Sequence, residues 1–487
     1  MLPDSRKRLV SKYPIRKEAT IDLHVSGVLQ NCTCFRVSLI CRAKPALQSA
    51  PSKMKAYLQY SNQLDALLDD IEWGANLQPE RQRVIHSLNG GASQALREIV
   101  SDKHIQRTGT FFTGELLARR VVSRVRRNKS LHRLPVYDPT CGVGDLLLHW
   151  TEFLPIESSL TSTLRIWERL IFGIDLHSEF IQVAKRRLVL QALFRGARLR
   201  RSLPPRIEDL FPGLTTGDIH KQGHVVPEDA TLLMNPPFTL TKAPKDCDWA
   251  SGKVSLAAVS FLKCLDGCSK GQHVVAILPD VLRSGTRYSH WRNRVEEKLQ
   301  IGRLDVYGRF DSYADIDVFI IEGQIGCGRV GTFGWTRISE GARRKKMKSI
   351  CSISVGAVVP HRDPQNGQWK PYVEVANLPA WGRVIEIDTR KRFKGSTVRP
   401  PFVAVRRTSS PSDAQRAIGT VVSGREPVAL ENHLIALRPH DGKLATCNVL
   451  MKSLKDSQTS AWLNKRIRCR HLTVKALREL PLWRDSS

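Results

Sequence analysis

Between residues 108 and 326, short apolar segments alternate with segments in which apolar residues recur at helical spacing. Strands and helices that alternate in this way predict an α/β fold, because each crossover helix packs on a face of a mostly parallel sheet. We expect an open, Rossmann-like sheet with helices on both faces. The predicted strands are 134–137, 171–174, 230–234, 274–278, 304–307 and 317–321, with helices over 180–188 and 257–265.

The rest of the chain differs in texture, which predicts four regions. Residues 1–53 show no sustained period and are interpreted either as a disordered extension or as the product of an upstream, non-native start. Residues 54–107 have helical spacing, and 108–328 hold the alternating pattern. Residues 329–487 predict a second, β-rich domain. Its predicted strands are 350–355, 372–375, 383–387, 402–405 and 434–437, with basic runs between them.

The charge of the chain is far from balanced. Its 487 residues carry a formal net charge of +30. This excess favours a polyanionic partner, with an anionic membrane surface as the competing possibility. No apolar run approaches the roughly 20 residues of a membrane span, and no signal peptide is evident. The 11 cysteines include no CxxC pair, so no metal site is predicted, and Cys141 is interpreted as a small packed residue.

One segment, Tyr137–Asp145, joins a predicted strand to an apolar helix start. Gly142 and Gly144 would form a turn in which the backbone approaches a ligand without a Cβ in the way. Asp138 is placed to hold a cationic or amino group. The pattern is not GxGxxG, so a pyrophosphate ligand is disfavoured. The alternative is an ordinary strand-to-helix turn.

Two further strands end in polar residues. Asp175 closes the second strand, where a carboxylate can accept hydrogen bonds from both hydroxyls of a ribose; the alternative is a helix-capping aspartate. The segment Asn235-Pro236-Pro237-Phe238 ends an apolar strand. Its prolines stiffen the backbone and remove two donors, so the asparagine and the neighbouring carbonyls would face outward as acceptors for an amino group, beside an aromatic ring. The alternative is a rigid turn without chemistry.

In this order, DPTCGVGDLL, GID, GDI and NPPF resemble the motifs of the amino-methyltransferases that modify adenine in DNA. An upstream segment, 107–113, resembles the family's GxFFTP segment, although Gly114 stands where proline is usual. The order is similar to the γ arrangement of type I modification subunits and single-chain type II modification enzymes. The resemblance covers about residues 105–325.

The resemblance implies a role for each motif residue. Thr113 and Asp138 would lie near the methionine portion of S-adenosylmethionine, with Gly142 and Gly144 beneath it. Asp175 would hold the ribose, while Asp218 and Ile219 would hold the cofactor's adenine, with Asp209 as a rival for Asp218. The implied catalytic residues are Asn235, Pro236, Pro237 and Phe238. Phe238 and Phe310 would stack on the target base, with Tyr313 as the alternative to Phe310. For Phe310 and Tyr313, simple core packing is the other interpretation.

The resemblance also implies the activity: transfer of a methyl group to the N6 amino group of a flipped-out adenine in double-stranded DNA. Residues 329–487 would select the DNA sequence, and restriction or specificity subunits are possible partners. A prokaryotic cytosol or nucleoid is the expected location, and cleavage by this chain is not expected. The alternatives are an RNA or protein-glutamine methyltransferase, or a modification subunit that is inactive without a partner.

Overall fold

The computed structural model describes fourteen stretches of the chain: 57–71, 80–101, 105, 108–126, 128–199, 206–221, 226–311, 313–314, 316–326, 333–336, 343–363, 366–409, 415–467 and 471–483. Two compact units divide the chain, at residues 1–49 and 50–487, and every described residue belongs to the second. The interpretation of residues 1–53 therefore falls outside the described residues. The boundaries predicted within the second unit remain predictions.

A seven-stranded sheet in the order β3-β2-β1-β4-β7-β9-β8 forms the centre of residues 108–326. The pairs from β3 to β7 are parallel, whereas β9 runs antiparallel to both β7 and β8. The predicted α/β class and mostly parallel sheet are confirmed. All six predicted strands occur, and β3 was not predicted. The bounds are β1 (Val136–Asp138), β2 (Ile171–Asp175), β3 (Leu214–Thr216), β4 (Thr231–Met234), β7 (His273–Pro279), β8 (Leu299–Arg309) and β9 (Asp317–Ile325).

The strands are buried on both faces, because alternate residues enter two different apolar cores. Leu233 of β4 belongs to one core and its neighbours Leu232 and Met234 to the other. On the first face the core includes α6 (Glu115–Val122), α7 (Asp145–Trp150), α8 (Leu160–Glu168) and α9 (Ser178–Phe194). On the second it includes α10 (Leu256–Asp266) and α12 (Ser289–Lys298), with α11 (Asp280–Ser284) at the end of β7 and the hairpin β5 (Leu240–Lys242) and β6 (Lys253–Ser255) ahead of α10. Runs of consecutive apolar residues suit strands covered on both sides.

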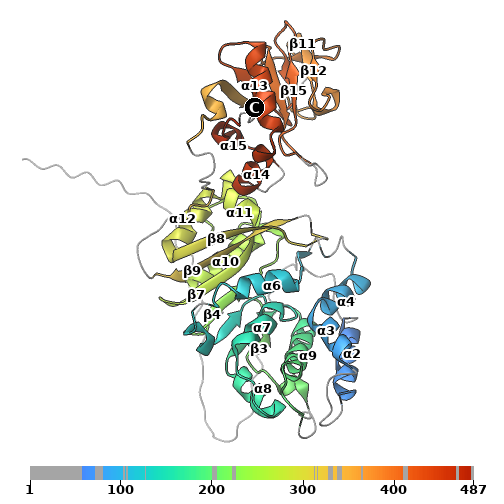
Figure 1. Cartoon of the computed structure of the whole chain (residues 1–487), viewed down its shortest axis with the longest axis vertical. Coiled ribbons are helices and arrows are strands. Elements are labelled where there is room, and N and C mark those ends of the chain that lie inside the picture. The colour runs from blue at the N-terminus through green and yellow to red at the C-terminus, as the bar shows by residue number, and fades with distance from the viewer. Residues whose placement is uncertain are drawn as a thin grey trace, which may run out of the picture. The chain divides into compact units, whose positions relative to one another are not determined.

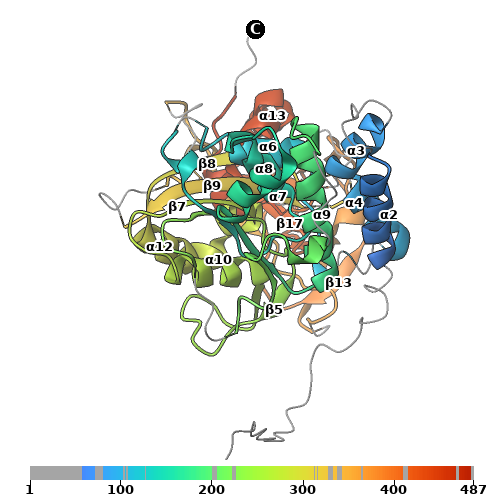
Figure 2. The same cartoon turned by 90° about the horizontal axis from the view of Figure 1, so that it is seen from below.

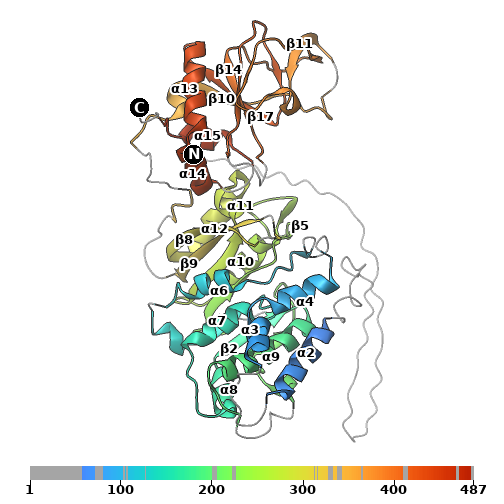
Figure 3. The same cartoon turned by 45° about the vertical axis from the view of Figure 1, so that its right-hand side comes forward.

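Ahead of the sheet lie three helices, of which the first two pack on α9 and the third packs on the second (Figures 2 and 3). These are α2 (Leu58–Asp69), α3 (Arg81–Leu88) and α4 (Gly91–Ile99). The ring of Tyr57 lies 5.2 Å from that of Phe180 in α9, in an edge-to-face contact. The helical pattern seen in this part of the sequence therefore forms helices that share the first core.

The C-terminal region, shown in orange and red in Figure 1, is built on a five-stranded sheet in the order β10-β17-β14-β15-β12. A three-stranded sheet, β13-β11-β16, shares a core with one face of it. The prediction of a β-rich region is confirmed, although the strand predicted over 383–387 is limited to β12. The bounds are β10 (Cys351–Val355), β11 (Gln368–Val373), β12 (Arg383–Val384), β13 (Arg390–Phe393), β14 (Phe402–Arg406), β15 (Gly419–Val422), β16 (Ala429–Leu430) and β17 (Leu434–Pro439).

Three helices in this region were not predicted: α13 (Leu444–Lys455), α14 (Ser457–Arg466) and α15 (Val474–Glu479). They cover the other face of the five-stranded sheet and share its core. Asp456 caps α14 and Thr473 caps α15, each through its side-chain oxygen, which satisfies otherwise unpaired amide groups. In the described part of the chain, no helix has the length and apolarity needed to cross a membrane.

Candidate functional site

Polar residues gather where the parallel strands of the central sheet end. Asp138 is the last residue of β1, Asp175 the last of β2, and Asn235 follows β4 directly. Asp218 follows β3. Because parallel strands end at a common edge, the topology brings these four motifs to one side of the sheet, which is where α/β folds bind ligands.

The loop after β1 depends on two glycines with left-handed backbone angles. Gly142 has φ +52° and Gly144, which precedes α7, has φ +83°. A Cβ on Gly144 would lie 3.2 Å from the Cβ of Ala184 in α9, so the loop is pressed against that helix. The amide of Gly142 donates to Asp175 at 3.1 Å, which joins the loop to the end of β2.

The site holds two carboxyl groups with raised pKa values, the buried Asp138 and the half-buried Asp175. Asp138 is 2% exposed and accepts hydrogen bonds from Thr140. Burial, with the nearby Asp175, raises the pKa of Asp138 to about 8. Burial also raises the pKa of Asp175, although the amides of His177 and Gly142 bond to its carboxylate. A bound group with positive charge would favour ionisation of both.

The amide of Asn235 is hydrogen-bonded through its nitrogen, whereas its oxygen is buried without a partner. Its Nδ2 donates to the carbonyl of Phe111 at 3.3 Å and to the hydroxyl of Thr113 at 2.8 Å. A carbonyl oxygen only accepts, so the atom facing Phe111 must be the NH2 group. The Oδ1 atom of Asn235 is therefore turned away from them, and it is buried without a hydrogen-bond partner. Such an acceptor is costly unless a ligand donates to it.

Three aromatic rings stand together beside this amide. The ring of Phe238 lies 5.3 Å from that of Phe310, edge to face, and 6.4 Å from that of Phe111, nearly parallel. Phe238 is half-buried, whereas Phe310 is 5% exposed. Both predicted stacking residues therefore lie together, although Phe310 also belongs to the first core. Tyr313 is instead 56% exposed and lies under the guanidinium of Arg97, 4.0 Å away.

The other predicted residues occupy distinct places. Asp218 is half-buried after β3 and accepts from the amide of His220, while Ile219 is buried in the second core. Asp209, the rival to Asp218, precedes β3 and has a side chain that is 72% exposed. Pro236 is buried and Pro237 half-buried. None of these contacts requires a ligand.

The segment ahead of the sheet reaches the same place. A Cβ on Gly109 would lie 2.9 Å from the amide nitrogen of Phe238, so residues 108–113 run directly beside the Asn235 turn. Gly114 has φ −60° and ψ 157°, a conformation that proline also adopts. The backbone conformation at Gly114 is therefore compatible with either glycine or the usual proline. Arg107 lies outside the described residues.

Arg187 of α9 was not singled out in the sequence, yet it holds the glycine loop in place. Its side chain is 1% exposed and donates to the carbonyls of Ser87, Leu88 and Val143 and to the carboxylate of Asp145, all at 2.7–2.9 Å. The guanidinium thus joins the end of α3 to the loop. A charged residue in a helical pattern is usually solvated, so this role was not predictable from the sequence.

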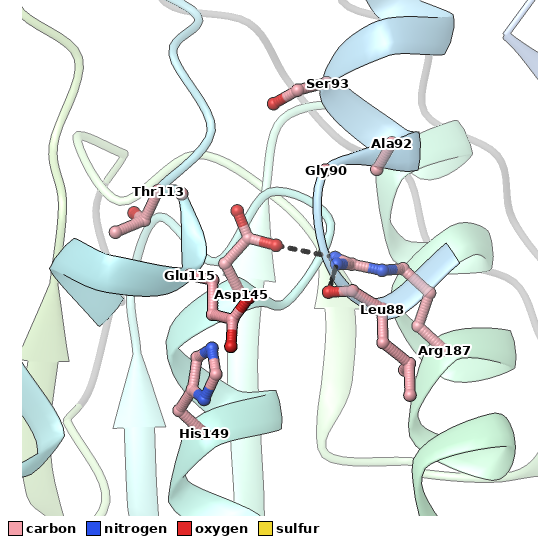
Figure 4. Close-up of a pocket in the computed structure, with 10 residues that line it drawn as sticks. Leu88, Gly90, Ala92, Ser93, Thr113, Glu115, Asp145, His149 and Arg187 are labelled. Atoms are coloured by element: carbon pink, nitrogen blue, oxygen red, sulfur yellow. Dashed lines mark hydrogen bonds and ion pairs between the residues drawn. The ribbon is translucent and has the colours of Figure 1, made fainter. Parts of the chain in front are cut away.

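A small pocket lies beside this arginine (Figure 4). Asp145 stands between Thr113 on one side and Arg187 on the other. The pocket has a volume of about 20 Å³, which accommodates a water molecule and no larger ligand. The remaining lining comes from Leu88, Gly90, Ala92, Ser93, Gly114, Glu115 and His149. Among the described residues, no group of three or more His, Cys, Asp or Glu side chains is placed to hold a metal ion.

The strand order, the glycine loop after β1 and the polar strand ends decide the fold. It is a Rossmann-like α/β fold. No family model matches this chain, and no curated protein matches it.

Solved structures with related folds are distant in sequence. The chain is similar to the type IIG restriction endonuclease BpuSI, with 11% identity, a TM-score of 0.45, and 88% of this chain and 70% of that one covered. It is similar to the type IIL restriction-modification enzyme MmeI in complex with DNA, with 13% identity, a TM-score of 0.49, and 80% and 70% covered. For the M protein of the type I restriction enzyme EcoKI the values are 14%, 0.33, 55% and 63%.

Proposed function

We propose that this chain transfers a methyl group from S-adenosylmethionine to the N6 amino group of a flipped-out adenine in double-stranded DNA. The observation that carries the proposal is the amide of Asn235, whose Oδ1 is buried and unpartnered while its Nδ2 is fixed by Phe111 and Thr113. An amino group on a flat ring would satisfy that oxygen, and the ring would lie against Phe238.

Asn235 would act on the electrons of the target nitrogen. The lone pair of an adenine amino group is delocalised into the ring, so the nitrogen is a poor nucleophile. Hydrogen bonds to Asn235 Oδ1 and to the carbonyl of Pro236 would favour a pyramidal nitrogen and stabilise the positive charge that develops on it. Because the amide is already fixed, little reorganisation is needed. A base inside a duplex is out of reach, so it must first be flipped out.

The glycine loop and its carboxylates fit a cofactor of this kind. S-Adenosylmethionine supplies, when bound, an activated methyl group on a positively charged sulfur. Asp138 and Thr113 would lie near its methionine portion and Asp175 at its ribose, while Asp218 and Ile219 would hold its adenine. The fit rests on charge, since Asp138 is buried and its pKa is raised to about 8 by that burial.

Residues 329–487 would provide the target-recognition domain, joined to a catalytic domain over 108–328 and helices over 54–107. The net charge of +30 favours nucleic acid over protein as the substrate. Methyl transfer measured on duplex DNA and on RNA distinguishes these two substrates. Restriction or specificity subunits remain possible partners, within a prokaryotic cytosol or nucleoid.

Asn235→Ala tests the proposal. The variant should lose methyl transfer to duplex DNA by a factor of at least about 100, as for loss of a preorganised group that acts on developing charge. Transfer is measured with radiolabelled cofactor on duplex DNA, RNA and protein by the purified chain. Cofactor binding, followed by calorimetry, should stay within a factor of about three.

Asn293→Ala is the matched control, because Asn293 is exposed on α12. It should leave transfer unchanged. Equal rates for Asn235→Ala and the wild type would remove Asn235 from the mechanism. Transfer to RNA or to protein glutamine, without transfer to DNA, would replace the proposed substrate.

A further inference from the structure

The two strands β11 and β13 form an antiparallel ribbon at the edge of the three-stranded sheet. Their pairing runs from Gln368 opposite Phe393 to Pro371 opposite Arg390. Four paired positions span about 10 Å at a rise of roughly 3.4 Å per residue. The ribbon is therefore short, and only β11 has a further neighbour, β16.

The two faces of the ribbon differ in composition. On the inner face, Tyr372 and Phe393 are buried in a small core with Val358 and Ala429. On the outer face, Trp369 stands directly opposite Arg392, and both are exposed. Trp369 is 59% exposed, although a tryptophan has the largest apolar surface of any side chain. The packing of the domain therefore does not account for this tryptophan.

The ribbon carries one sign of charge. Its ionised residues are Lys370, Arg390, Lys391 and Arg392, and neither strand contains an aspartate or glutamate. Arg390 is ion-paired with Glu426 at 2.6 Å, and Lys391 lies over the ring of Tyr372. Arg392 makes only a long hydrogen bond of 3.3 Å, to the carbonyl of Gly367. Among the ribbon's described contacts, the exposed guanidinium of Arg392, beside Trp369, is therefore the one that has only a weak partner.

We infer that the outer face of the β11–β13 ribbon, at Trp369 and Arg392, contacts the groove of double-stranded DNA. The inference rests on the proposed function and assigns its DNA contact to two side chains. A two-stranded ribbon fits the major groove of B-DNA, which is about 12 Å wide. Arg392 would meet a phosphate at the groove's edge, and Trp369 would place its ring against sugars and base edges inside the groove.

The charge argues for DNA over a protein surface. A cationic ribbon with no carboxylate gains from releasing the counterions of a polyanion. A-form RNA has a deep, narrow major groove that side chains do not reach, so duplex RNA should bind this face less well. RNA and protein partners are thus outcomes that would contradict the inference.

Trp369→Ala and Arg392→Gln separate the two contacts. Affinity is measured by fluorescence anisotropy on full-length protein, with a duplex DNA of mixed sequence over a series of salt concentrations. Trp369→Ala should weaken binding about tenfold and leave the salt slope unchanged. Arg392→Gln should weaken binding at low salt and reduce the slope of log K against log salt by about one.

Lys452→Gln is the control, since Lys452 is exposed on α13, which covers the opposite face of the five-stranded sheet. It should bind as the wild type does. The inference is overturned if Trp369→Ala and Arg392→Gln both bind duplex DNA as the wild type does, or if duplex RNA binds more tightly and loses affinity in both variants. Both substituted residues are exposed, so thermal midpoints should not change.

The failure of the ribbon and the failure of the proposed function give different results. If the wild type methylates DNA and the ribbon variants bind normally, only the ribbon is wrong. If the variants lose DNA binding but no chain methylates DNA, the ribbon stands and the proposed reaction is wrong.

Discussion

The buried side chain of Asp138 lowers the free energy of unfolding when its carboxyl group has to ionise. It lies at the end of β1, 2% exposed, and neither of its described hydrogen bonds comes from a cation. Structural aspartates with pKa values lowered by a nearby arginine stabilise a fold at neutral pH. Asp138 has the opposite shift, which is typical of groups arranged for a ligand.

The pH dependence of stability follows from this shift. Below pH 4 both the folded and the unfolded chain keep the proton on Asp138. Between pH 4 and the folded pKa of about 8, the unfolded chain releases a proton that the folded chain retains, so the free energy of unfolding falls as pH rises. Asp138→Asn should remove this loss and raise the free energy of unfolding at pH 8 by about 1 kcal/mol or more.

The measurement is urea denaturation of wild type and variant at pH 5 and pH 8. Asp209→Asn serves as the control, because its carboxylate is exposed. If wild type and Asp138→Asn lose stability in parallel over this range, the ionisation of Asp138 does not oppose folding.

At the scale of elements, most of the central sheet follows from the sequence, because most of its strands contain a short apolar segment. The exception is β3, whose three residues include only one that is buried, so no apolar run marks it. The helices α13 to α15 were missed because their apolar residues are interrupted by lysines and serines and follow a strand-rich stretch. The candidate site residues were predicted from motifs, whereas the places of Arg187 and Phe111 depend on contacts across the fold.

The glycine loop gives a prediction at this scale. Gly144→Ala places a Cβ at φ +83° and 3.2 Å from Ala184, so it should lower the free energy of unfolding by about 2–3 kcal/mol. Gly196→Ala places one at φ +105° at the end of α9 with no atom within 4 Å, so it should cost only about 1 kcal/mol. Urea denaturation gives both values. Equal costs would show that α9 does not press on the loop.

For the whole molecule, the net charge of +30 is the dominant property. It was available from composition, and it bears on the kind of partner and not on the fold. If the chain acts on DNA as proposed, composition does not predict the sequence that it selects, since recognition depends on which side chains reach base edges.

Salt provides the test at this scale. If the chain neutralises six or more phosphates, its affinity for duplex DNA should fall about a thousandfold between 50 and 200 mM salt. Anisotropy titrations over that range measure the fall. A drop of less than tenfold would mean that the positive charge serves another purpose.

The guanidinium of Arg187 has a consequence for the ancestry of the chain. Its N–H groups donate to carbonyls at the end of α3 and in the glycine loop, two segments about fifty residues apart. Recombination that exchanged one segment for an unrelated sequence would leave the buried guanidinium of Arg187 without part of its hydrogen-bond partners. The segment from α3 through the glycine loop to Arg187 in α9 should therefore be inherited as one unit. A crossover that gives a folded chimera should lie outside residues 81–187.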